Sequence, residues 1–134
     1  MKTLKLFVVF ALVAFQSVWA NQNDTNSKLT CAADAMYIYN FPLAMARSIP
    51  GQTKEVEKIQ SIQLGWYKFI LADLLTNGKS AEQAQAIVKA QIDKSTTKID
   101  ALLKDANQKN FNEIFETKVL PIQVACNDKF MQNN

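Results

Sequence analysis

Residues 53–77 read TKEVEKIQSIQLGWYKFILADLLTN, and this stretch decides the fold class. At 100° per residue, its apolar side chains cover well over half of the circumference of a helix. They are Val56, Ile59, Ile62, Leu64, Trp66, Tyr67, Phe69, Ile70, Leu71, Leu74 and Leu75. Thr53 is a plausible N-cap residue, and Gly78 is a stop signal. Because a helix this apolar is covered on several sides, we expect it to be the central element of an all-α protein.

A second helical pattern precedes this stretch and begins near Thr30, a good N-cap residue. Its apolar positions are Met36, Tyr37, Ile38, Phe41, Leu43 and Met45. Pro42 falls inside the pattern and should kink or interrupt the helix, because proline cannot donate the backbone hydrogen bond. Residues 49–51, Ile-Pro-Gly, form the turn into the central helix.

Two more helices follow. The first opens at Ser80, where Ser-Ala-Glu-Gln has the capping-box pattern. Its core positions alternate steps of four and three, on a narrower stripe than that of the central helix. They are Ala84, Val88, Ile92, Ser95, Ile99, Leu102 and Ala106. After a break at 107–110, the last helix carries Phe111, Ile114, Phe115, Val119, Ile122 and Phe130, and Pro121 should kink or divide it.

Four helices joined by short loops predict an up-down-up-down bundle with kinked first and last helices. In that arrangement the start of the first helix and the end of the last helix lie at the same end of the molecule. Cys31 and Cys126, the two cysteines of the chain, fall at these two places. We therefore expect one disulfide between them, which closes the bundle.

The first twenty residues have the pattern of an export signal. Lys2 and Lys5 precede an apolar run over 6–15, and Val18-Trp19-Ala20 offers a cleavage site. Ten apolar residues are too few to span a bilayer as a helix. We therefore divide the chain into a signal peptide (1–20), a polar, disordered lead-in (21–29) and a single helical domain (30–131). The location is periplasmic in a Gram-negative bacterium and secreted otherwise, with no membrane anchor after cleavage.

Charge and composition exclude several classes of function. Loss of the two signal lysines brings the formal net charge from +3 to +1. A near-neutral surface argues against nucleic-acid binding, which needs a clustered basic field. The chain has no histidine, which removes the Ser-His-Asp and Cys-His nucleophile systems and the His-based zinc sites. No glycine-rich phosphate loop or dinucleotide fingerprint is present. We expect a protein with no enzymatic activity, no metal and no cofactor.

Asp73 is the most unusual acid of the sequence, because it lies among the apolar residues of the central helix. A buried carboxylate is costly unless it is paired. Asp73 therefore either has a structural role, in a hydrogen bond or salt bridge or at an edge that reaches water, or is a polar anchor that lines a pocket or a partner surface. By contrast, Lys98 falls on the polar face of its helix, where substitutions usually change stability by no more than about 0.5 kcal/mol.

The candidate binding residues other than Asp73 are Tyr37, Tyr39 and Arg47. Residues 36–42 hold three aromatics and a methionine, more than one core stripe of a helix can absorb. Arg47 is the single arginine of the chain and precedes the Pro-Gly turn. Tyrosine and arginine are enriched at the centres of protein interfaces.

Two functions fit these observations. The first is a protein that binds a protein partner outside the cytoplasm, as an inhibitor, immunity protein or adaptor. In its signal, its helices and its two terminal cysteines, the chain resembles the small helical periplasmic immunity proteins paired with secreted antibacterial effectors. The second is a carrier of a small hydrophobic ligand in the bundle interior, where Pro42, Gly65 and Pro121 could open a cavity. An enclosed apolar cavity would favour the carrier, and a filled core with an exposed aromatic patch would favour the protein binder.

Overall fold

The computed structural model describes residues 24–131, and every regular element within this range is helical. The first helix covers residues 24–38 of the described range and continues, after a break at Tyr39, into α2. The other elements are α2 (Asn40–Ser48), α3 (Thr53–Thr76), α4 (Ala81–Leu102), α5 (Phe111–Ile114), the π-helical η1 (Phe115–Val119) and α6 (Leu120–Phe130). The last three follow one another directly, so the described chain forms four helical stretches. The predicted all-α class is confirmed.

The predicted start of the first helix is wrong. Residues 24–29 were expected to belong to a disordered lead-in, but they are helical. Thr25 and Lys28 bind Asp73 on α3, and Leu29 is buried in the core. These contacts hold the polar segment in place, and a sequence pattern does not reveal them. The signal peptide and residues 21–23 lie outside the described residues.

The local signals at the helix ends are mostly confirmed. The Ser80 hydroxyl accepts from the Gln83 backbone N–H at 3.1 Å, and the Ser80 N–H donates to the Gln83 side chain at 3.0 Å. Gly78 ends α3 with φ of 88°, and Lys79 N–H donates to Leu74 C=O, the hydrogen bond of a Schellman motif. Thr53 is not a cap residue, because α3 begins at Thr53 itself, with no side-chain cap hydrogen bond.

Both predicted proline disruptions are present. Pro42 is the third residue of α2, and the helix is interrupted at Tyr39, one turn earlier. Pro121 is the second residue of α6, and the π-helical turn η1 precedes it. Proline cannot donate to the carbonyl four residues before it, so the strain is released in the preceding turn.

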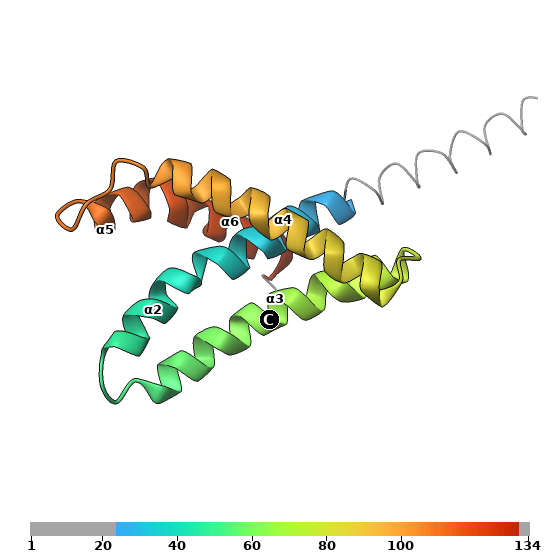
Figure 1. The fold of residues 1–134 in the computed structure, drawn as a ribbon, viewed down its shortest axis with the longest axis horizontal. Coiled ribbons are helices and arrows are strands. Elements are labelled where there is room, and N and C mark those ends of the chain that lie inside the picture. Colours follow the sequence, from blue (N-terminus) through green and yellow to red (C-terminus); the bar gives the residue numbers. More distant parts are fainter. Residues whose placement is uncertain (1–23, 132–134) are drawn as a thin grey trace, which may run out of the picture.

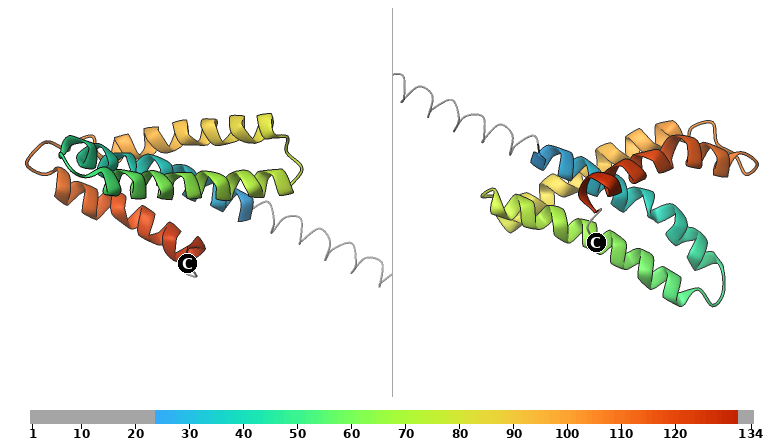
Figure 2. Two further views of the ribbon diagram at one scale, coloured as in Figure 1. Left: turned by 90° about the horizontal axis from the view of Figure 1, so that it is seen from below. Right: turned by 180° about the vertical axis from the view of Figure 1, so that it is seen from behind.

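The disulfide between Cys31 and Cys126 is formed, with a Cα–Cα distance of 5.5 Å. Successive helical stretches reverse direction along the horizontal axis of Figure 1, and the first helix and α4 cross obliquely. In the left view of Figure 2, α4 and α6 lie on opposite sides of α3. The result is a helical bundle closed by one disulfide, although its helices diverge more than the expected bundle does.

The most deeply buried element is the first helix, not α3 as predicted. Four consecutive residues, 32–35, have exposed fractions of 0–2%. Three of them are alanines, and such small side chains allow neighbouring helices to approach on every side. In contrast, Leu64 and Leu75 of α3 are 50% and 44% exposed. The buried residues of α3 form one stripe: Ile59, Trp66, Ile70 and Leu74.

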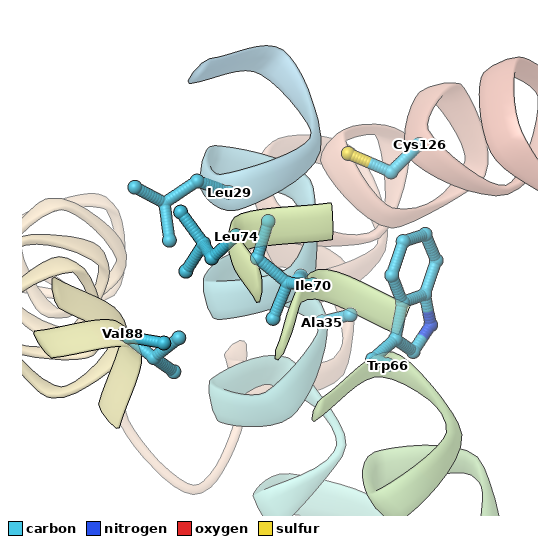
Figure 3. Packing of buried hydrophobic residues seen from close by; sticks show 9 residues of the cluster. Leu29, Ala35, Trp66, Ile70, Leu74, Val88 and Cys126 are labelled. Carbon is cyan, nitrogen blue, oxygen red and sulfur yellow. The ribbon is translucent and has the colours of Figure 1, made fainter. Parts of the chain in front are cut away.

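The hydrophobic core is divided into three clusters instead of one. The central cluster joins the first helix, α3, α4 and Cys126, and in Figure 3 Leu29, Ile70, Leu74 and Val88 converge while Trp66 lies on the Cys126 side. Leu43, Ala46 and Ile59 form a second cluster between α2 and α3. Ile38, Ile99 and Val119 form a third, between the first helix, α4 and η1. The second and third clusters stabilise two arms that diverge from the centre (Figure 1).

Candidate functional site: an aromatic groove between α3 and α6

Tyr37, a predicted binding residue, is half-buried and bonds to other residues of the protein. Its hydroxyl donates a hydrogen bond to Asp100 Oδ1, and its ring packs edge-on against Phe41 at 5.6 Å. The pKa of Tyr37 is raised to about 12: the largest cause is desolvation of the ring hydroxyl, and its hydrogen bond to Asp100 is a smaller one. Its ring also lines a shallow groove between the first helix and α3, together with Gln63, Leu64 and Tyr67.

Asp73 forms a structural ion pair, the first of the two roles considered for it. Its carboxylate accepts from Lys28 Nζ at 3.0 Å and from Thr25 Oγ1 at 2.8 Å, and Asn77 Nδ2 lies 3.4 Å away. Hydrogen bonds to Asp24 and Asp73 raise the pKa of Lys28 above its ordinary value. This network joins the beginning of the described chain to the end of α3. The donors Thr25, Lys28 and Asn77 take up most of the hydrogen-bonding capacity of the Asp73 carboxylate, so little of it is left for a partner.

Arg47 is the predicted binding residue that is exposed, whereas Tyr39, like Tyr37, is half-buried and lines an open groove. Arg47 is exposed in the last turn of α2 and forms no ion pair within residues 24–131. Met45 and Ile49, 57% and 52% exposed, are its neighbours at the tip of this arm. Tyr39 is half-buried at the break between the first helix and α2. The structure therefore separates Tyr39 from Arg47 along α2 and does not gather the four predicted residues into one site.

Tyr39 lines an open groove of about 540 Å³ between α3 and the end of α6. The other lining residues are Ile62, Gly65, Trp66, Phe69, Asn127 and Met131. The Trp66 and Phe69 rings meet edge-to-face at 5.7 Å, and Phe69 packs on Phe130 at 5.8 Å. Lys28 Nζ lies 5.8 Å from the centre of the Phe69 ring. The groove thus has an aromatic wall, and Asn127 adds an amide side chain to its lining.

Gly65 interrupts this wall at the middle of α3. Glycine in a helix interior costs about 1 kcal/mol relative to alanine. A Cβ atom built on Gly65 would meet nothing within 4 Å, apart from the local helix backbone, and the residue does not have a positive φ. Neither backbone conformation nor internal packing therefore requires a glycine. The open space above it belongs to the groove.

Exposed apolar side chains extend the groove along α6. Leu120 and Val124 are 40% and 49% exposed, and they precede Asn127 and Met131 at helical spacing. Residues four, three and four positions apart share one side of a helix. This stripe flanks the buried residues of α6 on the side of the groove.

The described residues contain no group of three or more His, Cys, Asp or Glu that could hold a metal ion. Glu113 and Glu116, the two acids that share a face of the last helix, are both exposed. No helix among the described residues is both long and apolar enough to cross a membrane.

The chain gives no significant match to protein-family models, to curated proteins or to solved structures. The functional argument therefore rests on the groove and on the sequence.

The sequence predicts a binding role for Tyr39 and places Gly65 among the residues that could open an internal cavity. It had assigned Trp66 to the core, and Trp66 is indeed 2% exposed while its edge lines the groove. The signal that could have revealed the groove is a glycine next to a tryptophan in the middle of a long helical pattern. The contribution of Asn127 and Met131 depends on where α6 packs, which no local pattern gives.

Proposed function

We propose that this chain is a small exported, non-enzymatic helical protein that binds a protein partner outside the cytoplasm, as an inhibitor, immunity protein or adaptor. We further propose that the partner docks an α-helix in the groove lined by Tyr39, Gly65 and Trp66. The observation that carries this proposal is Gly65, a helix-destabilising residue that lines the groove and that neither backbone conformation nor packing among the described residues requires. A partner helix that occupies the groove would explain why position 65 is a glycine.

The groove has the chemistry of a helix-binding site. Amphipathic helices insert apolar residues at positions i, i+3 or i+4, and i+7 into hydrophobic grooves. Helices pack 8–10 Å apart in general, and the distance depends on the side chains at the contact. Gly65 therefore permits a close crossing, between the larger side chains of Ile62 and Phe69. Tyrosine, tryptophan and methionine, all present in the lining, are enriched at interface centres.

Export is supported by the signal pattern over residues 1–20 and by the disulfide between Cys31 and Cys126. Disulfides persist in oxidising compartments such as the periplasm and the extracellular space. The location is periplasmic in a Gram-negative bacterium and secreted otherwise. Arg47, Met45 and Ile49 at the tip of the α2 arm offer a secondary, peripheral contact for a large partner.

The alternative is a carrier of a small hydrophobic ligand. The volume of the groove, about 540 Å³, falls within the range of ligand sites in proteins, roughly 300–1,000 Å³. However, the groove is open to solvent, and such sites usually enclose most of the ligand. The protein binder is therefore the preferred function.

A substitution that fills the groove tests the proposal. Gly65→Leu places a side chain in the groove, and Ala90→Leu makes a matched change on an exposed part of α4 outside it. We expect the wild type and Ala90→Leu to capture the same protein from the compartment where the chain resides, and Gly65→Leu to lose it. Capture by all three proteins, with equal affinity, would exclude the groove as the docking site.

The same variants separate the two functions. Once the signal peptide over 1–20 is removed, Trp66 is the single tryptophan of the chain, and its fluorescence reports occupation of the groove. Native mass spectrometry of the purified protein then asks whether a small molecule is retained. A bound lipid that is absent from Gly65→Leu, without any protein partner, would favour the carrier.

A further inference from the structure

The last helix, α6, depends on the disulfide for much of its attachment to the rest of the chain. Of its eleven residues, Gln123 and Cys126 are the two that are buried. The side-chain hydrogen bond of Gln123 stays within α6, and no hydrogen bond or ion pair joins α6 to another helix among the described residues. Its other contacts are apolar: Ile122 packs on the third cluster, and the Phe130 ring packs on Phe69.

The first helix, in contrast, is attached to α3 and α4 by contacts that do not involve the disulfide. Its residues 32–35 are buried, and five side-chain hydrogen bonds join it to these two helices. The bonds are those of Thr25 and Lys28 to Asp73, Gln63 to the Met36 carbonyl, Lys98 to Asp34, and Tyr37 to Asp100. We therefore expect the first helix, α3 and α4 to stay packed when the bridge is opened.

The chain just before α6 combines an anchored residue with a point where a helix can bend. Val119, the last residue of η1, is 0% exposed and packs with Ile38 and Ile99. Pro121 follows as the second residue of α6. Because proline and a π-helical turn both interrupt regular helical hydrogen bonding, helices bend at such points. A displacement of α6 would therefore begin near Pro121 and leave Val119 in place.

The disulfide is reachable from solvent. Cys31 and Cys126 both line an open surface pocket of about 470 Å³. Cys31 is half-buried and Cys126 is 6% exposed, so Cys31 is the more accessible of the two cysteines. Ser27 and Thr30 add polar side chains to the lining, which suits entry of a hydrated reagent. Thiol–disulfide exchange needs this access, because a thiolate must reach one of the two sulfur atoms.

The groove of the proposed function depends on the position of α6. Asn127, which directly follows Cys126, and Met131 supply the lining of the groove on this side. Cys126 also belongs to the same hydrophobic cluster as Trp66 (Figure 3). A displacement of α6 would therefore remove one side of the groove and expose Trp66, which is 2% exposed in the bridged protein.

We propose that the disulfide between Cys31 and Cys126 is a site of thiol–disulfide exchange, and that its opening by a dithiol reductant releases α6 and dismantles the groove. This regulation rests on the proposed function of the groove. The first thiolate of the reductant attacks Cys31 Sγ to form a mixed disulfide, and Cys126 leaves as a thiolate. The second thiolate then attacks the sulfur of the reductant in the mixed disulfide and releases Cys31. The bridge gains two electrons and the two protons of the dithiol, which is oxidised to its own disulfide.

Reduction by dithiothreitol without denaturant tests the release of α6 in the chain that lacks residues 1–20. We expect hydrogen exchange of the amides over 122–131 to accelerate by about tenfold or more, while the amides of α4 stay protected. Acrylamide should quench the fluorescence of Trp66, the single tryptophan of this chain, more strongly after reduction. A bridge that reacts only in denaturant would overturn the proposal, and so would equal acceleration of exchange in α4 and α6.

A variant without the bridge separates the loss of the bond from other effects of the reductant. Cys31→Ala/Cys126→Ala should show fast exchange over 122–131 and strong quenching of Trp66 without any reductant. Dithiothreitol should change neither of them. If α4 also loses its protection in this variant, the bridge maintains the whole fold and the proposal is wrong.

Capture of the partner distinguishes this regulation from the function on which it rests. We expect the oxidised chain to capture its protein partner, and the reduced chain, with its thiols blocked by iodoacetamide, to lose it. Equal capture by both forms would overturn the regulation and leave the docking groove in place. No capture by the oxidised chain would exclude the proposed function, and the exchange and quenching measurements would still decide whether reduction releases α6.

Discussion

Replacement of Lys98 by alanine tests a difference between the sequence pattern and the structure, because the sequence places Lys98 on a polar face and the structure pairs it with the buried Asp34. In the sequence Lys98 lies on the polar face of its helix, and the structure indeed leaves its side chain 44% exposed. However, its Nζ atom lies 2.7 Å from Oδ2 of Asp34, whose side chain is 3% exposed. The substitution therefore leaves a carboxylate in the core without its cation.

The magnitude follows from the burial of the two partners. Removal of one member of a fully buried ion pair costs about 3–5 kcal/mol, because the other charge stays uncompensated. The half-exposed lysine makes this pair weaker than a fully buried one, and we expect a loss of about 2–3 kcal/mol in the free energy of unfolding. Lys94→Ala, on an exposed position of the same helix, should change stability by no more than about 0.5 kcal/mol.

Urea denaturation followed by circular dichroism measures both variants, and an unchanged m-value shows that the two-state comparison is valid. The double variant Asp34→Leu/Lys98→Ala is a control. Because Asp34→Leu removes the buried charge, the double variant should be no less stable than Lys98→Ala alone. If Lys98→Ala and Lys94→Ala shift the denaturation midpoint equally, the burial of Asp34 and its pairing with Lys98 are wrong.

Three further predictions concern single contacts. Because the pKa of Tyr37 is raised to about 12, the unfolded chain loses this phenolic proton first, so stability should fall as the pH rises from about 10 to 12. In thermal melts, the melting temperature of Tyr37→Phe should fall less steeply with pH over that range than the melting temperature of the wild type. Asp73→Asn should lower the free energy of unfolding by about 1–2 kcal/mol, since it weakens charge-assisted bonds from the first helix; no change in the urea midpoint would contradict this. Replacement of Cys31 and Cys126 by alanine should cost about 2–4 kcal/mol, and equal melting temperatures of oxidised and substituted protein would refute a stabilising bridge.

The sequence was sufficient to predict the elements that depend on local chemistry. Residues close in sequence are enough to determine three of these features: the capping box at Ser80, the helix stop at Gly78 and the two proline disruptions. The pairing of Cys31 with Cys126 followed from helix count and direction. These features are local or topological, and they tolerate errors in helix register.

The central position of the first helix could not be predicted. Ala32, Ala33 and Ala35 carry a weak hydrophobic signal, and Asp34 between them suggests a surface. Their burial results from their small size, which matters only once the neighbouring helices are placed. Asp73 drew attention because it interrupts an apolar run, yet Asp34 is the more deeply buried acid.

The candidate site was predicted only in part, for a related reason. Tyr39 lines the groove, but the hydroxyl of Tyr37 is bound to Asp100. An aromatic-rich segment shows that some rings must lie outside one core stripe, and it does not show which ones. The division of the core into three clusters decides this, and it depends on contacts between distant parts of the chain.

The central claim is that Gly65 keeps the groove open for a partner at the expense of helix stability. The most direct measurement is the effect of one methyl group, Gly65→Ala, on both stability and affinity for the captured partner. Alanine has room and favours the helix, so the free energy of unfolding should rise by about 0.5–1 kcal/mol. Affinity for the partner should fall, because the methyl group enters the space that the partner occupies. A more stable protein that binds its partner as tightly as the wild type would contradict the claim.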